Sequence, residues 1–219
     1  MKMKIYLSPS SQFDNAYSGV ATNEAEQCRK IASYAKAALE RNGYTVKQGA
    51  NTTTFEMDDR TSESNAWGAD LHIPIHTNAG GGQGTEVYAY SGSMNDKYVK
   101  AIYDSVAAAS IGKDRGIKNG DHLYEVVNTS AVCCYIECEF HDTNGKWISD
   151  NVKKLGEAIA RGVCKADGKT FKEESEPVKP SDSGKLYRVQ VGAYKDKTNA
   201  EKMLKKLKSA GFEGIIKES

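Results

Sequence analysis

The stretch HIPIHTNAG, at residues 72–80, joins a short apolar strand pattern to a polar loop that contains glycine. Residues 71–76 are predicted to form the strand, with His76 at its end. Active sites of open α/β sheets lie at strand ends, so His76 is a candidate functional residue. His72 lies on the same strand face because side chains alternate along a strand, but a packed or surface histidine is favoured there.

A second segment, TNEAEQC at residues 22–28, places a carboxylate at the start of a helix. Asn23 is a typical N-cap, and the pattern that follows predicts a helix over residues 24–41. Glu24 would then lie in the first helical turn. The helix dipole alone favours an acid at that position, so a structural role and a metal-binding role both remain open.

A third segment, YIECEF at residues 135–140, belongs to the apolar run VCCYIECEF. An unpaired buried carboxylate is expensive, which favours a functional role for Glu137. Glu139 shares its strand face, so either glutamate can be the active one. Two carboxylates and a histidine are the ingredients of a catalytic zinc site that keeps one position open for water.

The chain up to Cys164 alternates between strand and helix patterns. Strands are predicted over residues 4–8, 44–47, 71–76, 85–90, 123–127 and 131–138, and helices over residues 24–41, 61–67, 95–110 and 145–164. Such alternation predicts an α/β fold, with a mixed, mostly parallel sheet covered by helices.

The composition changes after Cys164. Residues 165–184 hold two of the four prolines and almost no apolar side chains, which is typical of a linker. The sequence therefore predicts a catalytic domain, a linker and a C-terminal repeat, over residues 1–168, 169–184 and 185–219. The repeat is predicted to be a small β-α-β unit, with strands at residues 186–193 and 214–217 around a helix at residues 198–210.

Charge, hydropathy and cysteine content exclude several classes of protein. The net charge is +1, so no basic field indicates nucleic acid, and no apolar run approaches the roughly 20 residues of a membrane helix. The start, MKMKIYLSPSSQ, has only a three-residue apolar stretch and does not match a signal peptide. We therefore expect synthesis in the cytoplasm, with release by lysis or another route. The 5 cysteines show no CxxC spacing, so neither a disulfide framework nor a cysteine-type zinc site is predicted.

Over about residues 4–164 the chain resembles the zinc-dependent N-acetylmuramoyl-L-alanine amidases of the Amidase_3 type, found in bacterial autolysins and phage endolysins. IPIHTNA resembles the family segment S-I-H-x-N-A, which implies that His76 is a zinc ligand. CCYIECEFHDTN resembles L-V-E-x-G-F-x-x-N, which implies that Glu137 is the catalytic glutamate. NEAEQCRKIA aligns with E-x-x-x-N-L-x-[IL]-A, a register that selects Glu24 over Glu26 as a ligand.

The chain departs from the family at its first motif. Most members begin D-P-G-H-G, where the histidine is the first zinc ligand, whereas this chain has S-P-S-S-Q with Ser11 at the histidine position. A branch with an L-S-P-S-x-Q start takes this ligand slightly later, in a segment similar to FDNAYSG, and the matching residue here is Asp14. The resemblance thus implies zinc held by Asp14, Glu24 and His76, a set whose two carboxylates make the zinc a weaker Lewis acid. The alternative is a site that lacks one ligand.

The resemblance implies a peptidoglycan amidase. A zinc-bound water, activated by Glu137, would attack the amide that joins N-acetylmuramic acid to L-alanine. Arg115, in the family-like stretch DRGIK, is a candidate to hold a carboxylate of the stem peptide, with a surface arginine as the alternative. Two other functions stay open: another zinc peptidase acting on the stem peptide, and a peptidoglycan-binding protein with a degenerate metal site. In each case we expect action on the cell wall after release.

The C-terminal stretch LYRVQVGAYKDKTNAEKMLKKLKSAGF resembles the SPOR repeat, whose modules bind peptidoglycan glycan strands. One β-α-β repeat is recognisable where a full module has two. A second copy of the chain could supply the missing half, so we expect a homodimer held by residues 186–219. Its shared core would contain Val189, Val191, Leu204, Leu207 and Phe212.

Overall fold

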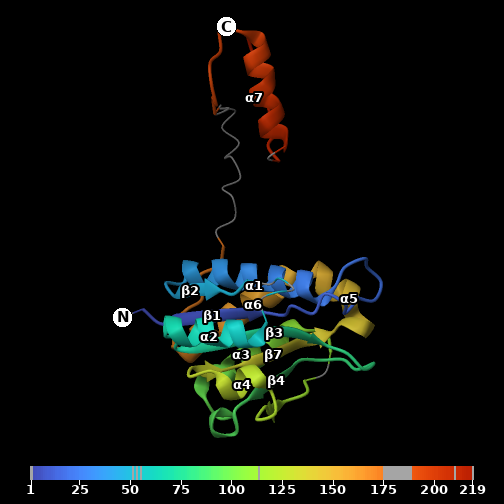
Figure 1. Cartoon of the computed structure of the whole chain (residues 1–219), viewed down its shortest axis with the longest axis vertical. Helices are drawn as coiled ribbons and strands as arrows, with labels where there is room; N and C mark the ends of the chain where they lie inside the picture. Colours follow the sequence, from blue (N-terminus) through green and yellow to red (C-terminus); the bar gives the residue numbers. More distant parts are fainter. Residues whose placement is uncertain are drawn as a thin grey trace. The chain divides into compact units, whose positions relative to one another are not determined.

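The structure is a computed structural model of the chain, and it describes residues 2–50, 52, 54, 56–112, 114–174, 189–209 and 211–218. Two compact units make up the chain, Met1–Glu174 and Ser175–Ser219 (Figure 1). None of the helices in the described part is long and apolar enough to cross a membrane.

The first unit is built around one mixed sheet. Its strands are β1 (Lys4–Pro9), β2 (Thr45–Gln48), β3 (Leu71–Asn78), β4 (Glu86–Ala89), β5 (Ile117–Asn119), β6 (Val132–Cys133) and β7 (Tyr135–Phe140). The strand order is β2-β1-β3-β7-β4-β5, with β6 also paired to β3. All pairs are parallel except β4 with β7, which confirms the predicted mixed, mostly parallel sheet.

Helices cover the sheet. They are α1 (Glu24–Arg41), α2 (Met57–Trp67), α3 (Lys97–Ala109), α4 (Tyr124–Asn128), α5 (His141–Asp150) and α6 (Val152–Ala166), with a short 3-10 turn, η1, at Ser91–Ser93. Helix α6 packs against both α1 and α3, whereas α2 packs against α4. Figure 1 shows α1 and α6 on one side of the sheet and α4 on the other.

Alternation along the strands gives the sheet one apolar face and one polar face. Ile5, Leu7, Ile73 and Ile136 are fully buried in the core that α1, α3 and α6 share with the sheet. Burying each such side chain contributes about 1.5–3 kcal/mol, so this face holds the unit together. The alternate residues of the same strands are mostly polar, and they carry the candidate site.

Helix α1 agrees with its prediction at both ends. The side chain of Asn23 accepts a hydrogen bond from the backbone N–H of Glu26 at 3.0 Å, as an N-cap does. The helix stops at Arg41, and Gly43 follows with a φ of 89°, a left-handed conformation that suits glycine. The cap fixes Glu24 as the first helical residue.

The strand predicted at residues 123–127 is wrong, because residues 124–128 form helix α4. The β-branched pair Val126 and Val127 favours a strand locally. In the helix, however, Val126 is buried while Glu125 reaches fully buried partners on neighbouring elements. Tertiary contacts therefore override the local preference, and the short strand β5 was not predicted at all.

Three other predicted elements have different bounds. The helix predicted at residues 145–164 is two helices, because Asn151 has non-helical angles between α5 and α6. The strand predicted at residues 131–138 is divided into β6 and β7 at Cys134. Helix α2 begins at Met57, earlier than predicted, because Glu56 and Asp59 form a capping box at its start.

The first unit includes part of the segment predicted as a linker. The backbone N–H of Lys172 donates to the side-chain oxygen of Asn42 at 2.7 Å, just after α1. The ring of Phe171 lies between the guanidinium groups of Arg41 and Arg161, 5.7 and 4.1 Å from its centroid. These contacts anchor the chain to the first unit as far as Glu174.

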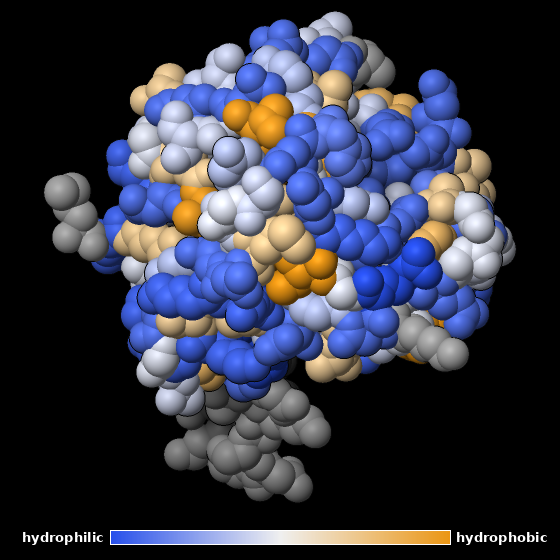
Figure 2. Space-filling model, turned by 90° about the horizontal axis from the view of Figure 1, so that it is seen from below, coloured by the Kyte–Doolittle hydropathy of each residue, from blue (hydrophilic) through white to orange (hydrophobic). Residues whose placement is uncertain are grey.

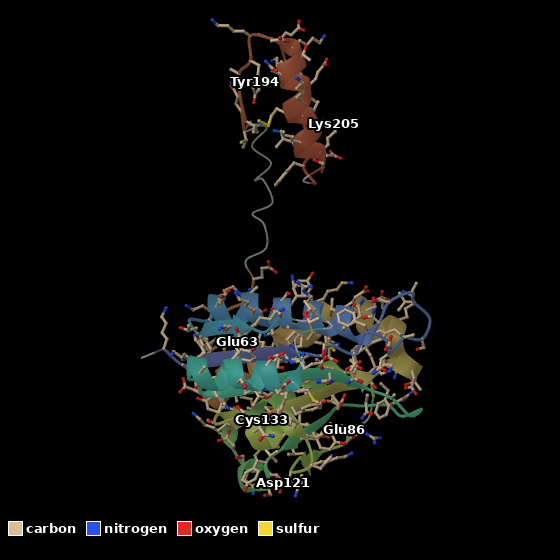
Figure 3. The ribbon with its side chains drawn as sticks, in the orientation of Figure 1. Glu63, Glu86, Asp121, Cys133, Tyr194 and Lys205 are labelled. Atoms are coloured by element: carbon tan, nitrogen blue, oxygen red, sulfur yellow. The ribbon has the colours of Figure 1, made fainter. Side chains whose placement is uncertain are left out.

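The second unit contains helix α7 (Lys197–Ser209), close to the predicted helix. Figure 3 labels Tyr194 on the segment before the helix and Lys205 on the helix itself. The two predicted strands are absent from the described residues 189–193 and 214–217, while residues 186–188 lie outside the described part. A strand needs a neighbouring strand for its backbone hydrogen bonds, and neither segment is paired with one within the described part of the second unit.

Candidate active site

Glu24 and His76 lie together although 52 residues separate them. Oε1 of Glu24, at the start of α1, is 3.0 Å from Nδ1 of His76, two residues before the end of β3. The backbone N–H of Thr77 also donates to Oε1 of Glu24, at 3.4 Å. Both side chains are buried, so the sequence-based pairing of this acid and this imidazole is present as a close contact.

The pair is electrostatically coupled. Burial disfavours the charge of His76, but the hydrogen bond and charge of Glu24 outweigh it and raise the pKa of His76. Burial likewise disfavours the charge of Glu24, and the hydrogen bond to His76 nevertheless holds its pKa below the usual range. The ring of His76 stacks on Tyr135 at 4.6 Å, and its Nε2 has no hydrogen-bond partner among the described residues.

Glu137 lies beside this pair on the next strand. It is paired in register with His76, through the parallel ladder between β3 and β7. Its Oε2 is buried and accepts no hydrogen bond within the described part of the chain. Burial, with a smaller contribution from the negative charges of Glu24 and Glu86, raises the pKa of Glu137 to about 8, although His76 opposes the shift. A carboxyl group with a pKa near neutrality suits proton transfer.

Glu139, the other glutamate of the segment, is fully buried and fully engaged. It accepts hydrogen bonds from the backbone N–H groups of Gly84 and Gly112, at 2.6 and 3.1 Å, and from Oγ of Ser110 at 2.5 Å. The two loops approach closely, because a Cβ on Gly112 would lie 2.0 Å from the backbone nitrogen of Gly84. Glu139 therefore fastens loops beside the site, and the contrast favours Glu137 as the reactive group.

Two cations flank the site, and both are held by Glu86 on β4, which Figure 3 labels. Nε of Arg115 donates to Oε2 of Glu86 at 2.7 Å, and Nζ of Lys118 donates to the same oxygen at 2.5 Å. Glu86 is paired in register with Glu137 across β4 and β7. The side chains of Arg115 and Lys118 are 37% and 38% exposed, so both cations stand at the rim of the site. Lys118 was not singled out from the sequence, although it shares the stretch DRGIK with Arg115.

Asp14, the predicted first ligand, is exposed. No hydrogen bond or ion pair within the described residues holds its side chain, and the structure does not bring it to His76. Gln12 lies there instead, with Nε2 3.4 Å from Nδ1 of His76. Nδ2 of Asn15 donates to Oε1 of Gln12 at 2.8 Å and to Oε2 of Glu24 at 2.7 Å. Sequence reasoning missed both amides, although Gln12 is the last residue of the L-S-P-S-x-Q start.

Another residue that the sequence analysis did not single out, His141, lies close to the carboxylate of Glu24. His141, the first residue of α5, has Nδ1 3.9 Å from Oε2 of Glu24. The same nitrogen lies 3.0 Å from the backbone oxygen of Thr77, to which it donates when protonated. The ring of Tyr17 stacks on His141, and its hydroxyl lies 3.0 Å from the hydroxyl of Thr77. The arrangement orients the carboxylate of Glu24.

His72 is buried and belongs to a separate polar cluster, in agreement with the packed role favoured for it. Its Nε2 is 2.8 Å from Oε2 of Glu125, and its Nδ1 is 2.9 Å from Oγ of Ser64. Ser8 donates to the same carboxylate oxygen at 2.6 Å. Arg60 completes the cluster, with Nη2 3.7 Å from the other oxygen of Glu125.

Glu24 and His76 would supply two of the three protein ligands that a catalytic zinc ion needs. A carboxylate oxygen and an imidazole nitrogen are donors that zinc uses, and they lie 3.0 Å apart. Among the described residues, however, no group of three or more histidine, cysteine, aspartate or glutamate side chains is arranged to hold a metal ion. The amide of Gln12 reaches Nδ1 of His76, and the amide of Asn15 reaches Oε2 of Glu24. The face of the molecule seen in Figure 2 is mostly hydrophilic, with only small separate hydrophobic areas.

A mixed α/β sheet that presents an acid–imidazole pair, and beside it a carboxyl group with one unpartnered oxygen, has the groups that a hydrolase uses. Residues 13–165 match the family model described as N-acetylmuramoyl-L-alanine amidase, and residues 165–218 match the SPOR domain. The chain belongs to the N-acetylmuramoyl-L-alanine amidase family, as its motifs predicted. It is an amidase that hydrolyses peptidoglycan, and its C-terminal part is a SPOR domain.

Curated relatives match most of the chain. The sporulation-specific N-acetylmuramoyl-L-alanine amidase of Bacillus subtilis (strain 168) is 33% identical over 221 residues, covering 98% of this chain and 84% of that protein. The endolysin of Bacillus phage SPP1 is 31% identical over 199 residues, covering 80% of this chain and 71% of that protein.

Solved structures agree with the fold. Cwp6 from Clostridium difficile is 25% identical with a TM-score of 0.68, covering 76% of this chain and 29% of that chain. The chain thus spans under a third of Cwp6. The catalytic domain of CwlV, an N-acetylmuramoyl-L-alanine amidase from Bacillus (Paenibacillus) polymyxa var. colistinus, has a TM-score of 0.69 at 18% identity, covering 78% of this chain and 100% of that chain, and shows the fold alone.

Proposed function

We propose that this amidase uses zinc and a zinc-bound water to cleave the amide bond between N-acetylmuramic acid and L-alanine. One observation carries the proposal: the contact between Glu24 and His76, 3.0 Å long, lies beside Glu137, whose buried Oε2 has no hydrogen-bond partner among the described residues. When bound, zinc would supply Lewis-acid polarisation of the amide carbonyl and a water of lowered pKa. Glu24 and His76 would hold it.

Glu137 is the proposed general base and then the general acid. It takes a proton from the attacking water and gives it to the nitrogen of L-alanine as the C–N bond breaks. A carboxyl group whose pKa is raised by burial can both accept and return a proton near neutral pH. The products are the lactyl carboxylate on the sugar and a stem peptide with a free amino terminus.

Arg115 is proposed to bind a carboxylate of the stem peptide. Its guanidinium is held by Glu86 and stacks over the ring of Phe140 at 4.9 Å, which fixes a half-exposed cation beside the site. Replacing Arg115 with alanine is expected to raise KM for a muropeptide about tenfold, with little change in kcat, since it removes a binding contact remote from the reacting bond. An unchanged KM would mean that Arg115 is a surface arginine with no role in substrate binding.

Metal analysis tests the zinc proposal. Purified full-length protein is expected to contain about one zinc per chain, as a catalytic site with a single ion requires. His76→Ala and Glu24→Gln should each lose the metal and the activity, whereas the adjacent exposed variant Glu26→Gln should retain both. Activity in a metal-free parent protein, or metal retained by His76→Ala, would contradict the proposal. Asp14 as the third ligand stays a prediction.

We further propose a homodimer held by residues 186–219. In the described part of the second unit, helix α7 has no buried residue, and Val189 and Ile215 are 90% and 89% exposed. The described part of this segment has one helix and no paired strand. Its length, about 35 residues, is below the roughly 40 residues that usually fold without disulfides, metals or association. A second identical copy offers the same apolar side chains and the same unpaired backbone, so a two-fold axis would satisfy both.

Light scattering decides the oligomeric state. The full chain should behave as a dimer, and a chain that ends at Glu174, the last residue of the first unit, should be a monomer. The variant Phe212→Asp should weaken the dimer, because Phe212 is apolar and 64% exposed in a single copy. A monomeric full chain would overturn the proposal, and so would a dimer that survives the truncation.

A further inference from the structure

We propose that the side-chain oxygen of Gln12 is the third metal ligand of this chain, in place of the histidine common in the family and of Asp14. The inference rests on the proposed zinc function and names the ligand that completes it. It explains why the described residues show no cluster of three histidine, cysteine, aspartate or glutamate side chains around Glu24 and His76, because the third donor is an amide.

The backbone places Gln12 between the two elements that carry the other ligands. The N–H of Ser10 donates to the carbonyl of Ile75 at 3.0 Å, which continues the β1–β3 ladder to the residue before His76. The carbonyl of Gln12 accepts from the N–H of Ala25 at 3.3 Å, beside Glu24 in α1. Gln12 is therefore anchored to both the strand end and the helix start.

The side chains converge as well. The amide of Gln12 reaches Nδ1 of His76, the same nitrogen that faces Glu24, at 3.4 Å. Asn15 bridges Gln12 and Glu24 through its Nδ2, and the backbone oxygen of Asn15 accepts from the N–H of Glu24 at 2.9 Å. Two polar side chains from separate segments, Gln12 and Glu24, thus converge on one imidazole nitrogen, and Asn15 joins them.

The amide can present its oxygen to a cation at this position. In the present arrangement its nitrogen faces His76, and its oxygen accepts from Asn15. The terminal torsion of glutamine is soft, and its oxygen and nitrogen exchange places by a half-turn. After that turn the oxygen of Gln12 would face the atoms of Glu24 and His76 that bind the ion. Asn15 would lose its bond to Gln12 and keep its bond to Glu24.

The other candidates are less well placed. Gln12 and Asp14 are both exposed, but only Gln12 reaches His76, and the described structure shows no hydrogen bond or ion pair of the Asp14 side chain. Nδ1 of His141 is already directed at the carbonyl of Thr77, 3.0 Å away, and is 3.9 Å from Glu24. His141 therefore orients the carboxylate of Glu24 and is not placed as a ligand beside His76.

An amide ligand has a chemical consequence. With Gln12 the ligand set carries one negative charge, whereas Asp14 would add a second. Fewer anionic ligands leave more of the cation's charge to polarise the substrate, but they also bind the cation less strongly. Carbonyl-type oxygen donors suit harder cations better than imidazole does. We therefore expect weaker zinc binding than a histidine would give, and a relatively smaller preference for zinc over manganese.

The test measures metal affinity in full-length protein stripped of metal. Zn²⁺ is titrated against a chromophoric chelator for the parent, Gln12→Ala, Gln12→His and the matched control Asp14→Ala from the same loop. Gln12→Ala should weaken zinc binding about tenfold or more, and Gln12→His should strengthen it by a similar factor, since imidazole suits zinc well. Asp14→Ala should bind as the parent does. Circular dichroism confirms that each variant is folded.

A second readout identifies the donor atom. Co²⁺ in the parent and in Gln12→His should give different visible absorption spectra, because an oxygen donor is replaced by a nitrogen donor. Identical spectra, or zinc affinity unchanged in Gln12→Ala, would overturn the assignment of Gln12. A tenfold loss in Asp14→Ala would transfer the role to Asp14. A parent chain that binds no zinc would instead refute the proposed zinc function itself, so the two failures are distinguishable.

Discussion

At the residue scale, hydrogen bonding separates two glutamates that the sequence could not. Glu137 and Glu139 share a strand and a chemistry, but Glu139 accepts bonds from two loops whereas Oε2 of Glu137 accepts none among the described residues. A buried carboxylate that is fully bonded is structural, and one that is left unpartnered is available for reaction. The choice depends on Gly84 and Gly112, which are far from the strand in sequence.

Glu137→Gln keeps the shape of the side chain and removes the proton acceptor. We expect zinc content near that of the parent and a loss of kcat of about a hundredfold or more, the usual scale for a general base. The matched variant Glu139→Gln should instead lower the melting temperature, because its amide cannot accept every bond that the carboxylate accepts. Retained activity in Glu137→Gln would move the base elsewhere.

At the same scale, Gln12 shows where sequence reasoning ends. The motif alignment placed serine where the family has histidine and therefore indicated Asp14, two residues beyond Gln12. The position of Gln12 depends on backbone bonds from Ser10 to Ile75 and from Ala25 to Gln12, which no local pattern reveals. His76 and Glu24 were predictable because a strand end and a capped helix start are local features.

At the scale of elements, a buried polar cluster connects two helices to the polar face of the sheet. Arg60 of α2 and Glu125 of α4 meet His72 of β3, and Nη1 of Arg60 also donates to the carbonyl of Pro9 at 3.0 Å. Pro9 ends β1, just before the loop that carries Gln12. This cluster therefore braces the strand end that leads into the site.

Removing one member of the cluster should be costly. Glu125→Ala leaves Arg60 buried without its partner, and breaking such a pair costs about 3–5 kcal/mol of unfolding free energy. Chemical denaturation of the chain that ends at Glu174 measures the loss. The exposed control Glu26→Ala should change the stability by less than about 0.5 kcal/mol. Equal stabilities for the parent and Glu125→Ala would contradict the bracing role.

The same carboxylate should make stability depend on pH. Burial opposes its charge, but the hydrogen bond from His72 and the charges of His72 and Arg60 outweigh it and hold the pKa of Glu125 below its usual range. A depressed folded-state pKa stabilises the fold above the unfolded value, about 4.3, and that stability is lost as pH falls through the folded pKa. Glu125→Gln should therefore show a shallower loss of stability than the parent below about pH 4.

Element boundaries also show which parts of the fold were predictable. Helix α1 was placed correctly because Asn23 and Gly43 mark its ends. Helix α4 was predicted as a strand, because Val126 and Val127 favour one and the partners of Glu125 are distant in sequence. The two strands of the second unit were predicted from alternating apolar and polar residues. Alternation does not supply the neighbouring strand that each needs, and the described residues of these segments form no strand.

At the scale of the whole molecule, catalysis and wall binding belong to separate units. The amidase match ends and the SPOR match begins at residue 165, and the compact first unit ends at Glu174. The chain that ends at Glu174 should therefore fold and cleave a soluble muropeptide at the parent rate. On intact cell walls it should bind less and act about tenfold or more slowly, because the tether and any avidity are gone. Co-sedimentation with purified walls measures the binding.

Equal wall binding by the two chains would show that the SPOR domain does not contribute to attachment. A truncated chain that fails to cleave the soluble fragment, although folded, would show that the second unit takes part in catalysis.

The most direct test of the central claim is mass spectrometry of purified peptidoglycan digested by the zinc-loaded protein. We expect intact glycan strands and released stem peptides with a free amino group on L-alanine, and no such products from His76→Ala or Glu137→Gln. New amino termini inside the stem peptide would contradict the account in favour of a peptidase. Wall binding without any cleavage by the zinc-loaded parent would contradict it in favour of a binding protein.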